Sequence, residues 1–106
     1  MSDVSLIYTT WPDEESARDA AQKLLEARLI ACANLLPGGT SLYQWKGKMQ
    51  AEAEWVMILK TARAPECTER IKALHPYEEP AILEWRVEAD GSSAGFLDWV
   101  RSETLG

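Results

Sequence analysis

The feature that most constrains this sequence is a long strand, turn and strand in the middle of the chain. Residues 30–45 are strand-like and are interrupted by Pro37-Gly38-Gly39. We expect a bulge or bend there, because proline removes a ladder donor and glycine admits positive φ. Lys46-Gly47-Lys48 is typical of a hairpin tip, and residues 52–61 return as the second strand. The segment therefore predicts one long hairpin.

The length of this hairpin bears on assembly. At about 3.3 Å per residue, its first strand could span on the order of 50 Å, against roughly 35 Å for the diameter of a compact domain of about 100 residues. The hairpin should extend beyond its own core unless a bend at Pro37 shortens it. Such an overhang is an aggregation-prone edge unless another chain covers it. It would expose the side chains of Leu42, Tyr43, Trp45, Trp55 and Met57. We therefore expect an oligomer.

The elements around the hairpin define the fold class. Strand patterns cover residues 4–10 and 81–87, and helix patterns follow Pro12-Asp13 and Ala64-Pro65. A last, short helix is marked by Phe96, Trp99 and Val100. The order is βαββαβ plus a helix, which predicts an α+β, ferredoxin-like sandwich with a long hairpin between its second and third strands and a short C-terminal helix. One domain should span residues 1–106.

Charge and cysteine content exclude several classes of protein. The formal net charge is -6, and Lys and Arg are scattered, so we expect neither a nucleic-acid partner nor a membrane partner. No apolar run reaches the roughly 20 residues of a spanning helix, and the segment Met1 to Val4 lacks signal-peptide features, so a cytoplasmic location is expected. Cys32 and Cys67 form no Cys-x-x-Cys motif, so the sequence supports neither a zinc site nor a disulfide.

Several segments resemble, in order along the chain, the signature segments of the CutA divalent-cation-tolerance proteins. They are Thr10-Trp11-Pro12-Asp13, Ala31-Cys32-Ala33-Asn34 with Pro37-Gly38, Ser41-Leu42-Tyr43-Gln44-Trp45-Lys46-Gly47-Lys48, Lys60-Thr61 and His75-Pro76-Tyr77-Glu78. The resemblance implies a homotrimer similar to the PII signalling proteins, in which long hairpins exchange sheet contacts between subunits. It also implies an association with copper and other divalent cations.

His75, the single histidine, and Glu78 offer a nitrogen and an oxygen that could form half of a divalent-cation site. A full site would need Tyr77, Glu79, Cys32 or groups of a neighbouring subunit. The alternative, which we favour, is that His75 and Tyr77 cap the second helix and pack at a subunit boundary. Copper-binding members of the family resembled can carry Cys and His at two positions that are Thr9 and Leu74 here. We therefore expect only weak binding of Cu²⁺ or another divalent cation.

Each of the other candidate site residues also has two interpretations. Cys32 is either a buried small apolar residue or a thiolate ligand, and the apolar strand around it favours the first. Lys60 could attract an anionic ligand into an inter-subunit cleft that Tyr77 also lines, or form a rim salt bridge. Trp45 and Trp55 are interpreted as interface anchors.

Three functions follow, of which a trimeric binding or regulatory protein, not an enzyme, is the first. The alternative is a small enzyme that uses His75 as a base with Cys32 or Tyr77 in an inter-subunit cleft. A metallochaperone ranks last, because such domains usually carry Cys-x-x-Cys where this chain has Thr10-Trp11-Pro12-Asp13.

Overall fold

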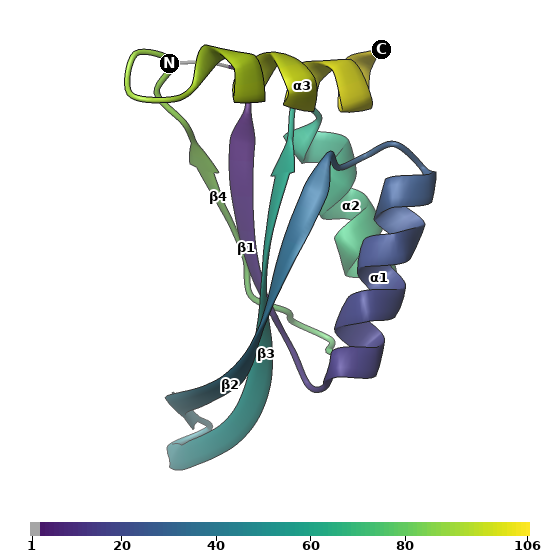
Figure 1. Ribbon diagram of the computed structural model, residues 1–106. Helices are drawn as coiled ribbons and strands as arrows, with labels where there is room; N and C mark the ends of the chain where they lie inside the picture. The colour runs from purple at the N-terminus through teal and green to yellow at the C-terminus, as the bar shows by residue number, and fades with distance from the viewer. Residues whose placement is uncertain (1–2) are drawn as a thin grey trace.

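A computed structural model describes residues 3–106, which form a four-stranded sheet and three helices (Figure 1). The elements in chain order are β1 (Ser5–Trp11), α1 (Glu14–Glu26), β2 (Cys32–Trp45), β3 (Lys48–Thr61), α2 (Ala64–Leu74), β4 (Ile82–Arg86) and α3 (Ala94–Leu105). The sheet order is β2-β3-β1-β4, and all neighbouring strands are antiparallel. The predicted α+β class and element order are confirmed. Residues 1–2, part of the segment in which we expect no signal peptide, lie outside the described residues.

Helices α1 and α2 lie on one side of the sheet, and α3 lies across one of its ends (Figure 1). Helix α1 begins where the Asp13 carboxylate accepts a hydrogen bond of 2.8 Å from the Ser16 backbone N–H. Its buried residues are mostly small: Ala17, Ala20, Ala21 and Leu24. None of the helices within residues 3–106 has the length and apolar character needed to cross a membrane.

Helix α2 places Cys67 in the core. Cys67 and Ile71 are both fully buried, and burial raises the pKa of the Cys67 thiol from 9.0 to about 12. Cys32 and Cys67 are both free. Helix α3 is longer than the short helix expected and buries Leu97, Val100 and Thr104, while Phe96 and Trp99 are exposed.

The two faces of the sheet differ in what covers them. Residues paired across antiparallel strands share a face, and the helix-covered face carries the fully buried Ile7, Thr9, Trp11, Met57 and Leu59. We call the opposite side the open face. It carries Leu6, Tyr8, Cys32, Asn34, Leu36, Val56, Ile58, Lys60, Leu83 and Trp85. Leu83 and Trp85 there are 56% and 54% exposed, so one chain leaves a broad apolar surface in contact with solvent.

The hairpin contains the expected bulge. The pairing of β2 with β3 passes from Leu36 opposite Val56 to Gly39 opposite Glu54, so that Pro37 and Gly38 together face Trp55. Gly38 has a φ of 81°, which favours glycine. The bulge also changes which residues of β2 lie on the open-face side, from the even-numbered ones before it to the odd-numbered ones after it.

Beyond the bulge, residues 39–54 form a curved extension that we call the arm. It bends away from α1 and α2 (Figure 1) and lengthens a molecule with principal extents of 44 × 28 × 22 Å. Its tip is a two-residue turn in which Lys46 and Gly47 have φ of 51° and 77°, as the hairpin turn that matches strand twist requires. Leu42 and Met49 are 72% and 74% exposed. The arm is bent at Pro37 and exposes Leu42, Tyr43 and Trp45, as expected. The exposure expected for Met57 was wrong, because this residue lies outside the arm on the helix-covered face and is fully buried, and Trp55 is half-buried.

Candidate ligand cleft

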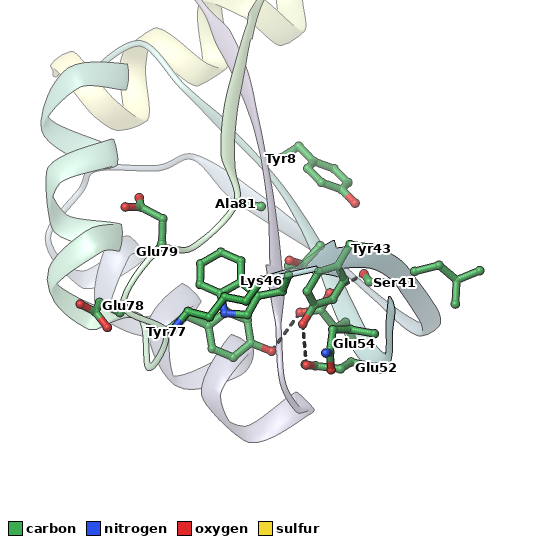
Figure 2. Close-up of a pocket in the computed structure, with 14 residues that line it drawn as sticks. Tyr8, Ser41, Tyr43, Lys46, Glu52, Glu54, Tyr77, Glu78, Glu79 and Ala81 are labelled. Atoms are coloured by element: carbon green, nitrogen blue, oxygen red, sulfur yellow. Dashed lines mark hydrogen bonds between the residues drawn. The ribbon is translucent and has the colours of Figure 1, made fainter. Parts of the chain in front are cut away.

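A cleft of about 1000 Å³ lies between the arm and the segment 77–81 that leads into β4 (Figure 2). Its wall combines Tyr8 and Thr10 of β1 with side chains of the arm and of that segment. The arm and the segment contribute Ser41, Leu42, Tyr43, Trp45, Lys46, Gln50, Glu52, Glu54, Tyr77, Glu78, Glu79 and Ala81. Hydroxyls, carboxylates and aromatic rings therefore surround one space.

The bulge explains why these arm residues face the cleft. Because it changes the side on which alternate residues of β2 lie, Ser41 and Tyr43 join Glu52 and Glu54 of β3 on the cleft side. The Tyr43 hydroxyl donates a hydrogen bond of 2.6 Å to Oε1 of Glu52. This bond raises the pKa of Tyr43, because loss of its proton would place two negative charges side by side. The hydroxyl therefore stays protonated and acts as a donor.

Glu54 lies at the base of the arm and is only 8% exposed. Its Oε2 accepts a hydrogen bond of 2.9 Å from the Tyr77 hydroxyl, and its Oε1 accepts one from the Ser41 hydroxyl. A buried carboxylate is stable only with such partners. Burial, followed by the hydrogen bond to Glu54, raises the pKa of Tyr77. Figure 2 shows Tyr43 and Tyr77 directed toward the two glutamates of the arm.

His75 lies behind the cleft and is 8% exposed. The Tyr77 backbone N–H, which can only donate, gives a hydrogen bond of 3.0 Å to Nδ1, so the ring proton is on Nε2. Nε2 donates to the Thr10 carbonyl at 2.7 Å, and this carbonyl is available because β4 pairs with β1 only as far as Thr9. The imidazole stacks on Trp11 with ring centroids 4.1 Å apart. Both nitrogens of His75 are thus used within the chain.

Burial lowers the pKa of His75, although the bond to Thr10 and the charge of Glu54 oppose the shift. The neutral ring is the form that this hydrogen-bond pattern requires, because a second ring proton would meet the Tyr77 N–H. The contacts agree with the interpretation that His75 caps the end of α2. There the backbone N–H of His75 donates a hydrogen bond of 2.9 Å to the Ile71 carbonyl.

The predicted site residues fall into two groups. Tyr77 and Glu78 line the cleft, whereas Cys32 and Lys60 lie opposite each other on β2 and β3. The Lys60 ammonium donates to the Asn34 side-chain oxygen. Lys60 is four residues along β3 from the partner of Thr10, a distance of about 13 Å. One chain therefore does not bring Cys32 or Lys60 to His75, and Cys32 is half-buried.

The residues of one chain do not fit a metal centre by themselves. Among residues 3–106, no three His, Cys, Asp or Glu side chains are grouped closely enough to hold a metal ion. Glu78 and Glu79 point away from the arm in Figure 2. Thr9 is fully buried, and its hydroxyl accepts a hydrogen bond of 2.7 Å from the Trp11 indole and donates one of 3.3 Å to the Met57 carbonyl.

Sequence analysis did not select Glu52 and Glu54 as candidate site residues, although both line the cleft. The alternation Gln50-Ala51-Glu52-Ala53-Glu54 indicates one polar side of a strand and could have shown that these carboxylates act together. The contact of Glu54 with Tyr77 could not be predicted in this way, because it depends on how the segment after α2 folds back.

Comparison with known proteins agrees with this fold. Residues 5–103 match the family model described as CutA1 divalent ion tolerance protein. The divalent-cation tolerance protein CutA of Thermus thermophilus is 43% identical, over 98% of this chain and 99% of that protein. The crystal structure of CutA from Xylella fastidiosa has a TM-score of 0.92 at 35% identity and covers 97% of this chain and 99% of its own.

A further solved structure, described as the periplasmic divalent cation tolerance protein CutA from Archaeoglobus fulgidus, is also similar. It has a TM-score of 0.89 at 36% identity and covers 95% of this chain and 98% of its own. The sequence match and the shared fold extend over nearly the whole chain. The chain therefore belongs to the CutA1 divalent ion tolerance protein family.

Proposed function

We propose that the chain is one subunit of a homotrimer that binds a small ligand or a divalent cation between subunits and acts as a binding or regulatory protein. The observation that carries this proposal is the exposed apolar open face beside the overhanging arm. Monomers rarely expose contiguous apolar patches of this kind unless a partner covers them. In the described chain the sheet ends at β2 and β4, so both outer edges are free to pair with another copy.

The test of assembly is sedimentation equilibrium at micromolar concentration. The expected mass is three times the 11.9 kDa of one chain. A stable monomer under these conditions would contradict the proposal.

Cation binding, as proposed here, is weak and shared between subunits. Glu78 is exposed and can supply an oxygen, while Cys32 and groups of a neighbouring copy would have to complete the site. His75 could join only by giving up its bond to the Thr10 carbonyl or to the Tyr77 N–H. The name of the family is consistent with a divalent cation as ligand.

Calorimetric titration with Cu²⁺ and with Zn²⁺ checks this proposal. We expect dissociation constants in the micromolar range or weaker, and a further loss in Glu78→Gln. Glu66→Gln is the matched control, because Glu66 is also an exposed carboxylate but lies on α2. Sub-micromolar affinity that disappears in His75→Ala would contradict weak binding and indicate a dedicated copper site.

The enzyme hypothesis gains little support from the geometry. A histidine base needs a nitrogen within hydrogen-bond reach of its nucleophile, but both nitrogens of His75 are engaged and the Tyr77 hydroxyl is directed to Glu54. A hydrolase or isomerase activity that is lost in His75→Ala, with the fold retained by circular dichroism, would favour the enzyme.

We also propose a cytoplasmic location. Two free cysteines are typical of a reducing compartment, although the similar Archaeoglobus fulgidus protein is described as periplasmic. Cell fractionation with an antibody against the chain tests this proposal, and recovery mainly in the periplasmic fraction would refute it.

A further inference from the structure

The arm has few restraints of its own. It is joined to the rest of the chain by two strands that bend at the bulge, where Pro37 and Gly38 of β2 lie opposite Trp55 of β3. Most of its side chains are exposed, and Glu54 is the one arm residue that is buried. A two-stranded ribbon with little packing is expected to move about its point of attachment.

Glu54 links the arm to the rest of the chain. Its two carboxylate oxygens accept hydrogen bonds from different elements, Oε1 from Ser41 on β2 and Oε2 from Tyr77, at 2.9 Å, on the segment after α2. We call Ser41, Glu54 and Tyr77 the Glu54 bridge. Hydrogen bonds to a charged acceptor are about twice as strong as neutral ones.

The far end of the Glu54 bridge is itself held in place. The Tyr77 N–H is bonded to His75, and the two rings have centroids 4.8 Å apart. His75 in turn bonds the Thr10 carbonyl and stacks on the fully buried Trp11. Continuous contacts therefore run from the base of the arm to β1 and the core.

We propose that the Glu54 bridge is a positioning device that fixes the angle of the arm and so prepares the arm to bind a second copy of this chain. The inference rests on the proposed trimer. A flexible arm would lose conformational entropy each time it paired with a neighbouring subunit, whereas an arm already held at the required angle loses less. Tyr77 would then act on assembly through the arm.

The experiment compares Tyr77→Phe with Tyr43→Phe. Each variant removes one phenolic hydroxyl that donates to a glutamate of the arm, but the Tyr43 to Glu52 bond lies entirely within the arm. The rate of subunit exchange between two differently labelled trimers is measured for each variant. We expect exchange at least about tenfold faster in Tyr77→Phe and changed less than about twofold in Tyr43→Phe. Equal rates in the two variants would overturn the proposal.

Amide hydrogen exchange of residues 39–52 separates this inference from the assembly on which it rests. Faster exchange in Tyr77→Phe than in Tyr43→Phe supports the Glu54 bridge, and no difference refutes it, even if the wild-type protein sediments as a monomer. Ser41→Ala removes the donor to Glu54 that itself lies in the arm and leaves the Tyr77 bond in place, so it should change exchange less than Tyr77→Phe does. If Tyr77→Phe does not fold, Glu54→Gln, which removes the charge from the acceptor of the Tyr77 bond, decides the question by the same two measurements, with Glu52→Gln as its control within the arm.

Discussion

At the scale of single residues, Thr9 shows how a position that could hold a metal ligand can be structural instead. The resemblance to CutA proteins implies that copper-binding members can carry a cysteine there. In this chain the threonine hydroxyl is fully buried and connects the Trp11 indole to the Met57 carbonyl. Trp11 is also the ring on which His75 stacks. Thr9 therefore supports the wall behind the cleft.

Thr9→Val should destabilise the fold by about 1 to 3 kcal/mol, because it leaves the buried Trp11 N–H without its acceptor while keeping the shape of the side chain. Thr9→Ser keeps the hydroxyl and should lose less, chiefly the contacts of one methyl group. Guanidinium unfolding measures the free energies at fixed protein concentration. Equal stability of Thr9→Val and the wild type would show that the bond to Trp11 contributes nothing.

Much of the candidate site could not be predicted from the sequence, because its contacts join residues that are far apart along the chain. Tyr77 and Glu78 could be selected because they lie in a distinctive segment, and both line the cleft. His75 is the C-cap of α2, as the favoured alternative expected, because Pro76 directly after it disfavours helical geometry, while its packing at a subunit boundary stays a prediction. The partner of Tyr77 could not be predicted, because Glu54 is 23 residues away along the chain and no local pattern joins them.

At the scale of elements, prediction succeeded where periodicity and turn residues decide the structure. The bulge at Pro37-Gly38 and the turn at Lys46-Gly47 were both expected from local chemistry, and both are present. The length of α3 was underestimated, because its buried residues, Leu97, Val100 and Thr104, include a polar one and its aromatic residues are exposed. Tertiary packing against Val4 and Ala31 selects its buried side.

Two glycine substitutions should have opposite effects on stability. Gly47 has a φ of 77° at the hairpin tip, so Gly47→Ala should lower the free energy of unfolding by about 1 kcal/mol through backbone strain alone, since space is open around it. Gly95 lies in the first turn of α3 with open space around it, so Gly95→Ala should raise stability by about 0.5 kcal/mol. Thermal unfolding followed by circular dichroism measures both, and the same sign for the two variants would contradict this reasoning.

At the scale of the whole molecule, one chain leaves a broad apolar surface uncovered. Helices α1 and α2 lie on one side of the sheet (Figure 1). The other side presents Leu83, Trp85 and their neighbours to solvent. The arm and this open face adjoin the same cleft, because Tyr8 and Thr10 of β1 line it together with the arm. The proposed assembly and the proposed ligand binding therefore concern one continuous surface.

Leu83→Asp should weaken assembly without unfolding the subunit. The substitution places a charge in an apolar contact and should make association less favourable by at least about 2 kcal/mol per subunit. Leu25→Asp is the matched control, because Leu25 is also an exposed leucine but lies on α1, away from the open face. Light scattering after size exclusion should show smaller particles for Leu83→Asp only. An unchanged mass for both variants would place the interface elsewhere.

The bulge at Pro37-Gly38 also limits how this hairpin can vary among relatives. Since alternate residues of a strand point in opposite directions, losing one residue there would turn Ser41 and Tyr43 outward and leave Glu54 without its β2 partner. Insertions or deletions between the bulge and Tyr43 would therefore be tolerated only in even steps. Among relatives, the number of residues between the bulge and the position of Tyr43 should therefore differ only by even numbers, while the extra residue at the bulge stays in the same place.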